Sequence, residues 1–420
     1  MNRMLLRAGV LAILASATLL AQAADFALRD GDTVVFYGDS ITDQRMYTVV
    51  AETFTLTRFP GRKIRFVHSG WGGDRVTGGG GGPIEERLKR DVDPYKPTVM
   101  TVMLGMNDGR YRAYDPEIFK TYADGYVKIL DLLKASNPNL RLTLIQPSPY
   151  DDVTRAPLFE GGYNDVLLRY AAFVKDLAAR NNQSTADLNT GVTAMLRRAN
   201  ATDPATAKLI IPDRVHPGWA GHLIMGEELL KAWNAPRIVT AVELDLAAKR
   251  VVDQNNTTVT GLRLDGGTYS WTQADQALPM PLPDKSAATQ LAVKSSDFWE
   301  ALNQQPLKLA GLDPAKRWTL RINGAKTGEF TGAELAAGVN LAKLDTAMMQ
   351  QAEQVQALTV KRTNVHQMRW RQLQVPFDKD GYPRMASILL QLDALDEDIA
   401  ARQRSTAKPG AFFYELSPVL

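Results

Sequence analysis

Three residues of this 420-residue chain have the types and the local settings that nucleophilic catalysis requires. Ser40 ends a Gly-Asp-Ser tripeptide, and Asp213 lies three residues before His216. A serine hydroxyl is a weak nucleophile until a base takes its proton, and histidine suits that work near neutral pH. A neighbouring carboxylate fixes the imidazole tautomer and stabilises the imidazolium. The pattern predicts acyl transfer with Ser40 as nucleophile, His216 as base and Asp213 as its partner.

Acyl transfer also needs donors for the oxyanion that forms on the substrate carbonyl. A glycine-rich stretch follows one predicted strand at 70–73, and Asn107 follows another in Gly-Met-Asn-Asp. Glycine lets a backbone N–H approach the substrate closely, and an asparagine amide supplies a further donor. Losing one such donor costs about 3–4 kcal/mol in known cases.

The elements that must position these residues alternate between short apolar runs and longer helical patterns from residue 32 to about 233. The strands are expected at 33–37, 64–67, 98–104 and 142–145, and helical spacing recurs over 118–133, 164–180 and 218–233. This alternation is typical of βαβ units and a mostly parallel sheet. In open α/β sheets, ligands bind outside the carboxyl ends of the strands, so the polar segments are expected to meet there.

In their order and setting these segments resemble the blocks of the SGNH/GDSL hydrolases. The residues that carry the match are Ser40, Gly73, Asn107, Asp213 and His216. The resemblance covers residues 25–235 and implies a three-layer α/β/α fold of flavodoxin-like type. It also implies an oxyanion hole built from the backbone amides of Ser40 and Gly73 and the side chain of Asn107. His68 stands where many members of the family have asparagine.

Residues 1–24 have the pattern of a secretory signal peptide. Arg3 and Arg7 precede an apolar run, and residues 21–23 fit an A-x-A cleavage site. The alternative is an uncleaved membrane anchor, but the small and polar residues end the apolar run where a span would continue. We therefore expect an exported protein, periplasmic or secreted, with no stable membrane association after cleavage.

The second half of the chain changes character after Pro236. Alternating segments separated by Asn, Gly and Asp turns predict a β-rich accessory unit at 236–345. A helical C-terminal segment is expected at 346–420, and no catalytic group is evident in it. No residue in either part suggests an oligomeric state.

Other residues beside the blocks have both a functional and a structural interpretation. Candidate substrate contacts are Asp39, Trp71, Arg75, Arg110 and Arg214; the alternatives are a helix cap for Asp39, core packing for Trp71 and solvation for the arginines. His68 and His222 are expected to be structural, and His366 to be solvated. The glycine run 78–82 lacks the Lys-Ser/Thr of a phosphate loop, which favours a mobile or closely packed loop.

Composition excludes several classes of function. Removing residues 1–24 leaves 47 basic against 46 acidic side chains, which gives no reason to expect nucleic acid or an anionic membrane as partner. Four histidines, no cysteine and no H-E-x-x-H pattern argue against a metal site, and we expect no cofactor.

The functional hypothesis is an exported serine esterase that removes O-acetyl groups from a polysaccharide or oligosaccharide. The rivals are a lipolytic or aryl esterase of lysophospholipase type, and a non-catalytic carbohydrate-binding protein on a hydrolase fold.

Overall fold

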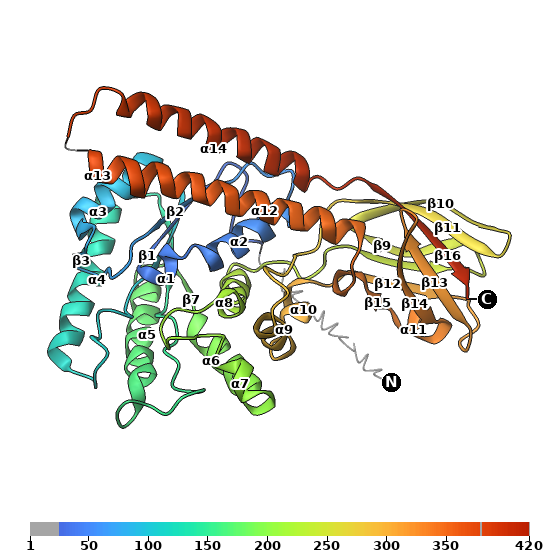
Figure 1. The fold of residues 1–420 in the computed structure, drawn as a ribbon, viewed down its shortest axis with the longest axis horizontal. Coiled ribbons are helices and arrows are strands. Elements are labelled where there is room, and N and C mark those ends of the chain that lie inside the picture. The colour runs from blue at the N-terminus through green and yellow to red at the C-terminus, as the bar shows by residue number, and fades with distance from the viewer. Residues whose placement is uncertain (1–24, 379, 420) are drawn as a thin grey trace, which may run out of the picture.

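The computed structural model describes residues 25–378 and 380–419 (Figure 1). The expected signal peptide at 1–24 lies outside the described residues. Within the described part of the chain, no helix is both long and apolar enough to cross a bilayer.

The first part of the chain, called here the α/β unit, is built on a parallel five-stranded sheet. Its strands run in the order β2-β1-β5-β6-β7. Their bounds are β1 (Thr33–Gly38), β2 (Arg65–Gly70), β5 (Val99–Met103), β6 (Arg141–Ile145) and β7 (Ser184–Ala186). This is the flavodoxin-like order, and the central strands are buried on both faces because helices cover them.

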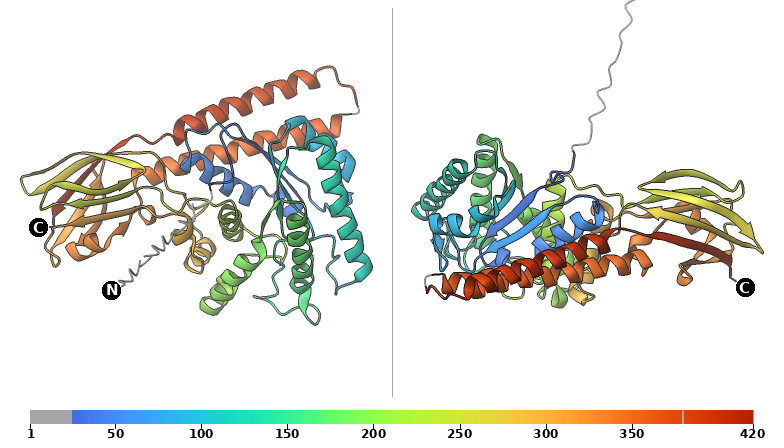
Figure 2. Two further views of the ribbon diagram at one scale, coloured as in Figure 1. Left: turned by 180° about the vertical axis from the view of Figure 1, so that it is seen from behind. Right: turned by 90° about the horizontal axis from the view of Figure 1, so that it is seen from above.

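Right-handed crossovers place the helices on both faces of this sheet. The chain steps from β1 to β2 in one direction and from β2 through β5 to β7 in the other, so α2 lies on the opposite face from α3, α4 and α5. Helix α8 returns to pack against α2 (Figure 2). The bounds are α2 (Met46–Arg58), α3 (Ile84–Asp91), α4 (Pro116–Ser136), α5 (Gly162–Arg180), α6 (Leu188–Thr202), α7 (Pro204–Ala207) and α8 (Trp219–Ala232). The predicted three-layer α/β/α fold is confirmed.

Helix α4 shows why the predicted periodicity was sound. Asp115 caps its first turn by accepting from the amides of Glu117 and Ile118, and Pro116 occupies the first helical position. The apolar residues spaced by three and four, among them Tyr122 and Tyr126, are all buried. Both tyrosine hydroxyls donate to carbonyls at the end of β5 and just beyond it.

The β-rich unit consists of two sheets that share a core around Trp271, Leu320 and Tyr414. One sheet has the order β10-β11-β16-β13-β14: β10 (Thr257–Asp265), β11 (Thr268–Asp275), β16 (Ala411–Pro418), β13 (Arg317–Ile322) and β14 (Ala325–Thr331). The other has the order β15-β12-β8-β9: β15 (Val339–Asn340), β12 (Pro306–Ala310), β8 (Ala241–Asp245) and β9 (Arg250–Asn255). The helix α11 (Gly332–Ala337) packs against β12 and β14.

The predicted boundaries of the second half need two corrections. Helices α9 (Ala287–Lys294) and α10 (Phe298–Leu302) fall inside the predicted β-rich unit, yet they pack against α8 and join the core of the α/β unit. The predicted helical segment 346–420 ends in β16, whose alternate residues are buried in the β-rich unit. In both places the chain crosses between units because its apolar side chains are buried there: those of α9 and α10 in the core of the α/β unit, and those of β16 in the core of the β-rich unit.

The helical hairpin, residues 347–407, lies along the α/β unit (Figures 1 and 2). It consists of α12 (Ala347–Gln367), the π-helical segment η3 (Met368–Gln374), α13 (Val375–Phe377) and α14 (Met385–Ala407). Helix α12 contacts both α2 and β2. At that contact the buried Arg362 binds both carboxylate oxygens of Glu52, at 3.1 and 3.0 Å, and the carbonyl of Phe66 at 2.9 Å.

Candidate active site

Ser40 lies at the first position of a short helix, α1 (Ser40–Asp43), directly after β1. Asp39 caps this helix, because its carboxylate accepts from the amide of Ile41 at 3.0 Å. The turn needs glycine at position 38, where a Cβ would lie 2.3 Å from Thr42 Oγ1. Burial raises the pKa of Asp39 to about 7. The backbone therefore presents the Ser40 hydroxyl at the carboxyl edge of the sheet.

The structure brings Ser40, His216 and Asp213 into one continuous chain of hydrogen bonds. His216 Nε2 lies 2.8 Å from Ser40 Oγ, and His216 Nδ1 lies 2.7 Å from Asp213 Oδ2. The other oxygen of Asp213 accepts from the amides of Val215 and His216 at 2.9 and 2.7 Å. Burial opposes the charge on Asp213, but these bonds outweigh it and lower the pKa of the carboxyl. This arrangement can pass a proton from the serine to the imidazole.

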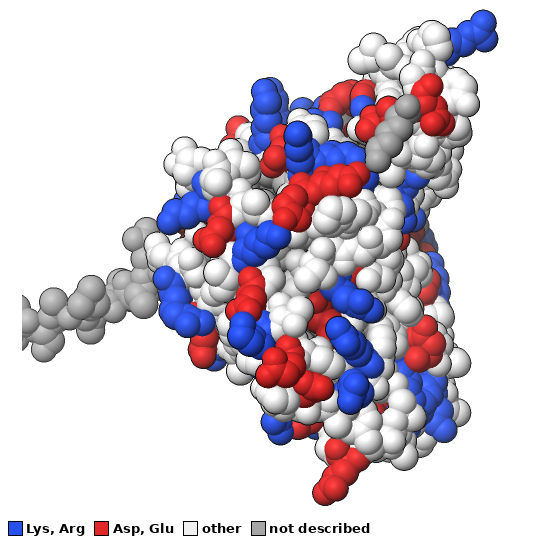
Figure 3. Space-filling view, turned by 90° about the vertical axis from the view of Figure 1, so that its left-hand side faces the viewer, with Lys and Arg blue, Asp and Glu red and all other residues white. Residues whose placement is uncertain are grey.

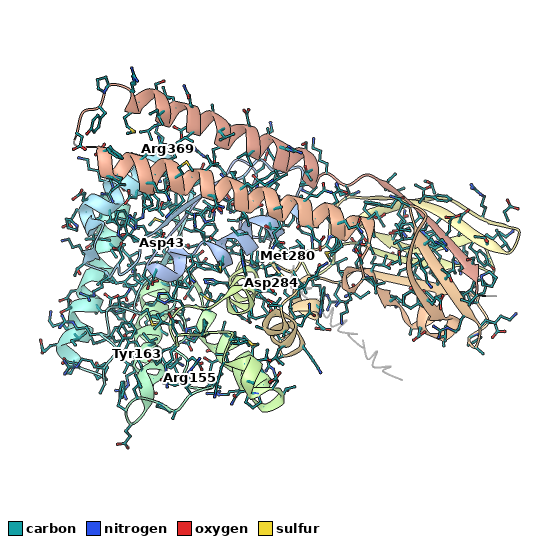
Figure 4. The ribbon with its side chains drawn as sticks, in the orientation of Figure 1. Asp43, Arg155, Tyr163, Met280, Asp284 and Arg369 are labelled. Carbon is teal, nitrogen blue, oxygen red and sulfur yellow. The ribbon has the colours of Figure 1, made fainter. Side chains whose placement is uncertain are left out.

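Arg155 supports the loop that carries Asp213 and His216. Its guanidinium donates to the carbonyls of Ile211 and Pro212 at 3.0 and 2.8 Å and pairs with the buried Asp151 at 2.8 Å. Figure 4 labels Arg155 near the foot of the α/β unit. Beyond the loop, Gln44 donates to the carbonyl of Pro217 at 3.3 Å. The histidine is thus fixed by contacts from two sides.

The predicted oxyanion donors Gly73 and Asn107 follow β2 and β5, the two parallel neighbours of β1, and so lie at the same edge of the sheet as Ser40. Gly73 has a φ of +79°, a conformation that favours glycine. In the part of the chain that the structure describes, the amides of Ser40 and Gly73 donate to no other protein group. Asn107 Nδ2 donates to the carbonyl of Asp74 at 3.0 Å, which leaves its second hydrogen for a substrate.

Two tyrosines that the sequence did not single out as positioning residues fix the Asn107 segment. The hydroxyl of Tyr111 donates to Asn107 Oδ1 at 2.9 Å, and that of Tyr163 donates to the Met106 carbonyl at 2.5 Å. The rings of Tyr111 and Tyr163 lie 5.1 Å apart, and Figure 4 labels Tyr163 near Arg155. The four-residue spacing from Asn107 to Tyr111 was the available signal, but without the fold the spacing does not show that the two side chains face each other.

The predicted substrate contacts divide into two groups. Asp39 is 2% exposed and caps α1. Trp71 is 8% exposed, and its ring lies against Arg87, Arg90 and Arg371, so both residues have the structural contacts that were the alternative for each. The three predicted arginines remain near the surface. Arg75 donates to the carbonyl of Asn107, Arg214 to that of Ala156, and Arg110 is exposed.

The glycine run 78–82 forms a close-packed turn. It contains the short strands β3 (Gly78–Gly79) and β4 (Gly82–Pro83). A Cβ at Gly81 would lie 2.6 Å from the ring of Trp71, so the glycines let the backbone approach this side chain.

The remaining histidines have structural settings. His68 is buried between Thr48 Oγ1 at 2.7 Å and Glu52 at 3.3 Å, and His222 lies 3.0 Å from Gln44 Oε1. The expectation for His366 was wrong: its Nε2 lies 3.0 Å from the carbonyl of His68, and its ring stacks on Trp370. It is held in this way because α12 docks on β2. Burial lowers the pKa of both His222 and His366 to about 3.

The side chains of the proposed base and its carboxylate partner are partly open to solvent. The side chain of His216 is 37% exposed and that of Asp213 is 55% exposed. Acidic and basic side chains are interspersed over the face shown in Figure 3, in keeping with the formal charge of +3. A surface of this kind does not select its ligand by net charge.

A serine, a histidine and a carboxylate in hydrogen-bonded sequence at the edge of a parallel sheet are the arrangement of a serine hydrolase. Residues 36–224 match the family described as GDSL-like Lipase/Acylhydrolase. This segment, which is less than half of the 420-residue chain, is a domain of that family, as its SGNH/GDSL motifs predicted, and it identifies a carboxylic ester hydrolase.

Two individual proteins also resemble this chain. An acetylxylan esterase of Geobacillus stearothermophilus is 27% identical over 223 residues, which cover 48% of this chain and 93% of that protein. A solved structure of a gut microbial diltiazem-metabolizing enzyme aligns with a TM-score of 0.80 at 24% identity, covering 93% of this chain and 98% of the other. The second likeness concerns the fold, and it includes the accessory parts as well as the α/β unit.

Proposed function

We propose that this protein is an exported serine esterase that removes O-acetyl groups from a polysaccharide or oligosaccharide. The observation that carries the catalytic part is the chain of hydrogen bonds at 2.8 and 2.7 Å from Ser40 through His216 to Asp213. In this proposal Ser40 is the nucleophile, His216 is the general base and acid, and Asp213 orients the imidazole.

The reaction follows from these positions. Ser40 Oγ attacks the ester carbonyl carbon while His216 Nε2 takes the hydroxyl proton, and the resulting oxyanion accepts from the amides of Ser40 and Gly73 and from Asn107. His216 then protonates the departing alcohol, which leaves an acyl group on Ser40. Water attacks this acyl-enzyme after losing a proton to His216. The collapse returns that proton to Ser40 Oγ and releases the acid.

The proposed substrate class is supported by the accessibility of the site and by one relative. The exposed side chains of His216 and Asp213 leave room for a bulky alcohol part of the ester at the surface. The acetylxylan esterase that resembles residues of this chain acts, by its name, on an acetylated glycan. Export is supported by the residue pattern of 1–24.

The substrate is tested with p-nitrophenyl acetate, butyrate and octanoate, and with acetylated xylan, pectin and chitin-type oligomers. We expect the highest kcat/KM for acetate and release of acetate from at least one glycan. Preference for octanoate would instead favour the lipolytic alternative. Glycan binding without turnover of any ester would favour the non-catalytic one.

The nucleophile is tested by Ser40→Ala, which should lower kcat by about 10⁴- to 10⁶-fold because the triad acts as a unit. Ser136→Ala, at the C-terminal end of α4, is the matched control and should keep the wild-type rate. Wild-type turnover in Ser40→Ala would refute the assignment.

Sequencing the N-terminus of the protein from a periplasmic fraction tests export, and a mature chain beginning near residue 25 is expected.

A further inference from the structure

The helical hairpin contacts the loop that carries the proposed oxyanion donor Gly73. This oxyanion loop comprises residues 71–73. Gln367 ends α12, and Arg371 lies in the π-helical segment η3. Figure 4 labels Asp43 on the side of α12 that faces away from α14. Asp43 is where the hairpin meets the loop.

The carboxylate of Asp43 joins the two elements. Gln367 Nε2 donates to its Oδ1 at 3.3 Å, and Arg371 Nη2 lies 4.0 Å from its Oδ2. The same Oδ2 accepts from the backbone amide of Gly72 at 3.2 Å. The Arg371 guanidinium also covers the ring of Trp71, with its carbon 3.2 Å from the ring centroid. The hairpin therefore contacts Trp71 directly and is linked to Gly72 through Asp43.

This contact lies directly beside the nucleophile. Asp43 is the last residue of α1, which begins with Ser40, and a Cβ placed on Gly72 would lie 4.0 Å from Ser40 Cβ. A shift of the loop would move the Gly73 amide relative to the reacting carbonyl. A displacement of about 1 Å at such a donor can cost about 100-fold in rate.

The docking of the hairpin depends mainly on other residues. Trp370 Nε1 donates to Asp91 at 2.7 Å, His366 lies 3.0 Å from the His68 carbonyl, and Arg362 binds Glu52. By contrast, the side chains of Arg371 and Asp43 are 23% and 22% exposed. Removing the contacts to Asp43 should leave the hairpin in place, so their effect on the loop can be measured separately.

We propose that Gln367 and Arg371 are positioning residues that fix the oxyanion loop through Asp43, so that the helical hairpin supplies part of the active-site support. The inference rests on the proposed esterase function but not on the identity of the alcohol. Gln367 restrains one carboxylate oxygen of Asp43, and Arg371 supplies positive charge beside the other while it packs on Trp71.

Steady-state kinetics of Gln367→Ala, Arg371→Ala and the double variant on p-nitrophenyl acetate test this role. We expect kcat to fall by about 10- to 100-fold in the double variant with KM changed less than about threefold, because the loss concerns the transition state. Arg371→Lys should recover only part of the rate, since lysine keeps the charge but not the planar cover of the ring. In an Asp43→Ala background Gln367→Ala should cause little further loss, because the carboxylate through which Gln367 acts is gone.

Arg369→Ala is the control for loosening the hairpin alone. Arg369 pairs with Asp393 across the two helices at 2.7 Å and does not contact the oxyanion loop. Its loss should change kcat less than about twofold, because partly exposed ion pairs contribute little. If Arg369→Ala slows the enzyme as much as Arg371→Ala, or if the double variant keeps the wild-type kcat, the proposal is overturned.

Amide hydrogen exchange provides a readout that does not need turnover. The peptide that covers residues 71–76 should exchange faster in the double variant than in the wild type, while peptides from α12 stay protected. Unchanged exchange at 71–76 would overturn the proposal, whether or not the wild type hydrolyses the esters offered. Absence of wild-type hydrolysis together with faster exchange would instead overturn the proposed function and leave the coupling supported.

Discussion

Replacing Tyr111 by phenylalanine removes one hydroxyl from the support of the oxyanion site and keeps the ring. That hydroxyl donates to Asn107 Oδ1 at 2.9 Å, while Asn107 Nδ2 donates to the Asp74 carbonyl, so the two contacts together fix the orientation of the amide. Burial, with a contribution from the charge of Asp39, raises the pKa of Tyr111 to about 12. The hydroxyl therefore remains a donor throughout an ordinary assay range, and the effect should be independent of pH.

The magnitude follows from the setting of this bond. A neutral hydrogen bond contributes about 0.5–1.5 kcal/mol net. The Tyr111 residue is 39% exposed, so water can replace the hydroxyl in part and the lower end of that range applies. A loss of about 0.5–1 kcal/mol corresponds to a kcat about two- to fivefold lower. KM should change little if the bond acts only through Asn107.

A double-mutant cycle with Asn107→Ala checks this reasoning. Asn107→Ala alone should lower kcat by about 10²- to 10³-fold, as expected for loss of one oxyanion donor. Adding Tyr111→Phe should then have no further effect, because the group it orients is gone. If the two effects multiply, or if Tyr111→Phe raises KM and leaves kcat unchanged, Tyr111 acts on the substrate directly and the positioning argument fails.

Two further predictions concern buried charges. Arg362→Met leaves Glu52 buried without its main partner and should lower the free energy of unfolding, measured in urea, by about 3–5 kcal/mol. The double variant Glu52→Leu/Arg362→Met should restore much of this free energy. Equal losses in the single and the double variant would contradict the reasoning. Burial raises the pKa of Asp108 to about 7 from 3.8, so the native carboxyl keeps a proton that the unfolded chain loses as pH rises between these values. Asp108→Asn should therefore reduce the fall in Tm from pH 5 to 8, and an unchanged fall would exclude Asp108 as its cause.

The α/β unit and the juxtaposition of Ser40, His216 and Asp213 were predictable because their signals are local. Buried parallel strands appear as continuous apolar runs, and the ends of such strands meet at one edge of the sheet. Ser40 follows one strand directly, and His216 lies three residues after Asp213. Once the strands are placed, few alternative positions remain for these residues.

The supporting contacts were not predictable because they join distant segments. Arg362 and Glu52 are 310 positions apart, and Gln367 and Asp43 are 324 apart. No local pattern marks either pair, since a polar residue on an amphipathic helix is ordinarily solvated. The strand Ala411–Pro418 did carry a signal, because Phe412, Tyr414 and Leu416 alternate with exposed or half-buried neighbours. The prediction of a helical segment at 346–420 missed this strand.

The position of β16 has a consequence for how the protein forms. β16 lies between β11 and β13, where Tyr414 pairs with Trp271 on one side and with Ile322 on the other. Until β16 is in place, the two halves of that sheet are not joined, and β11 and β13 expose unpaired edges. Late, long-range pairing of this kind raises contact order and slows folding. The helical hairpin is made immediately before β16, so its docking on the α/β unit can limit the search of that strand for its place.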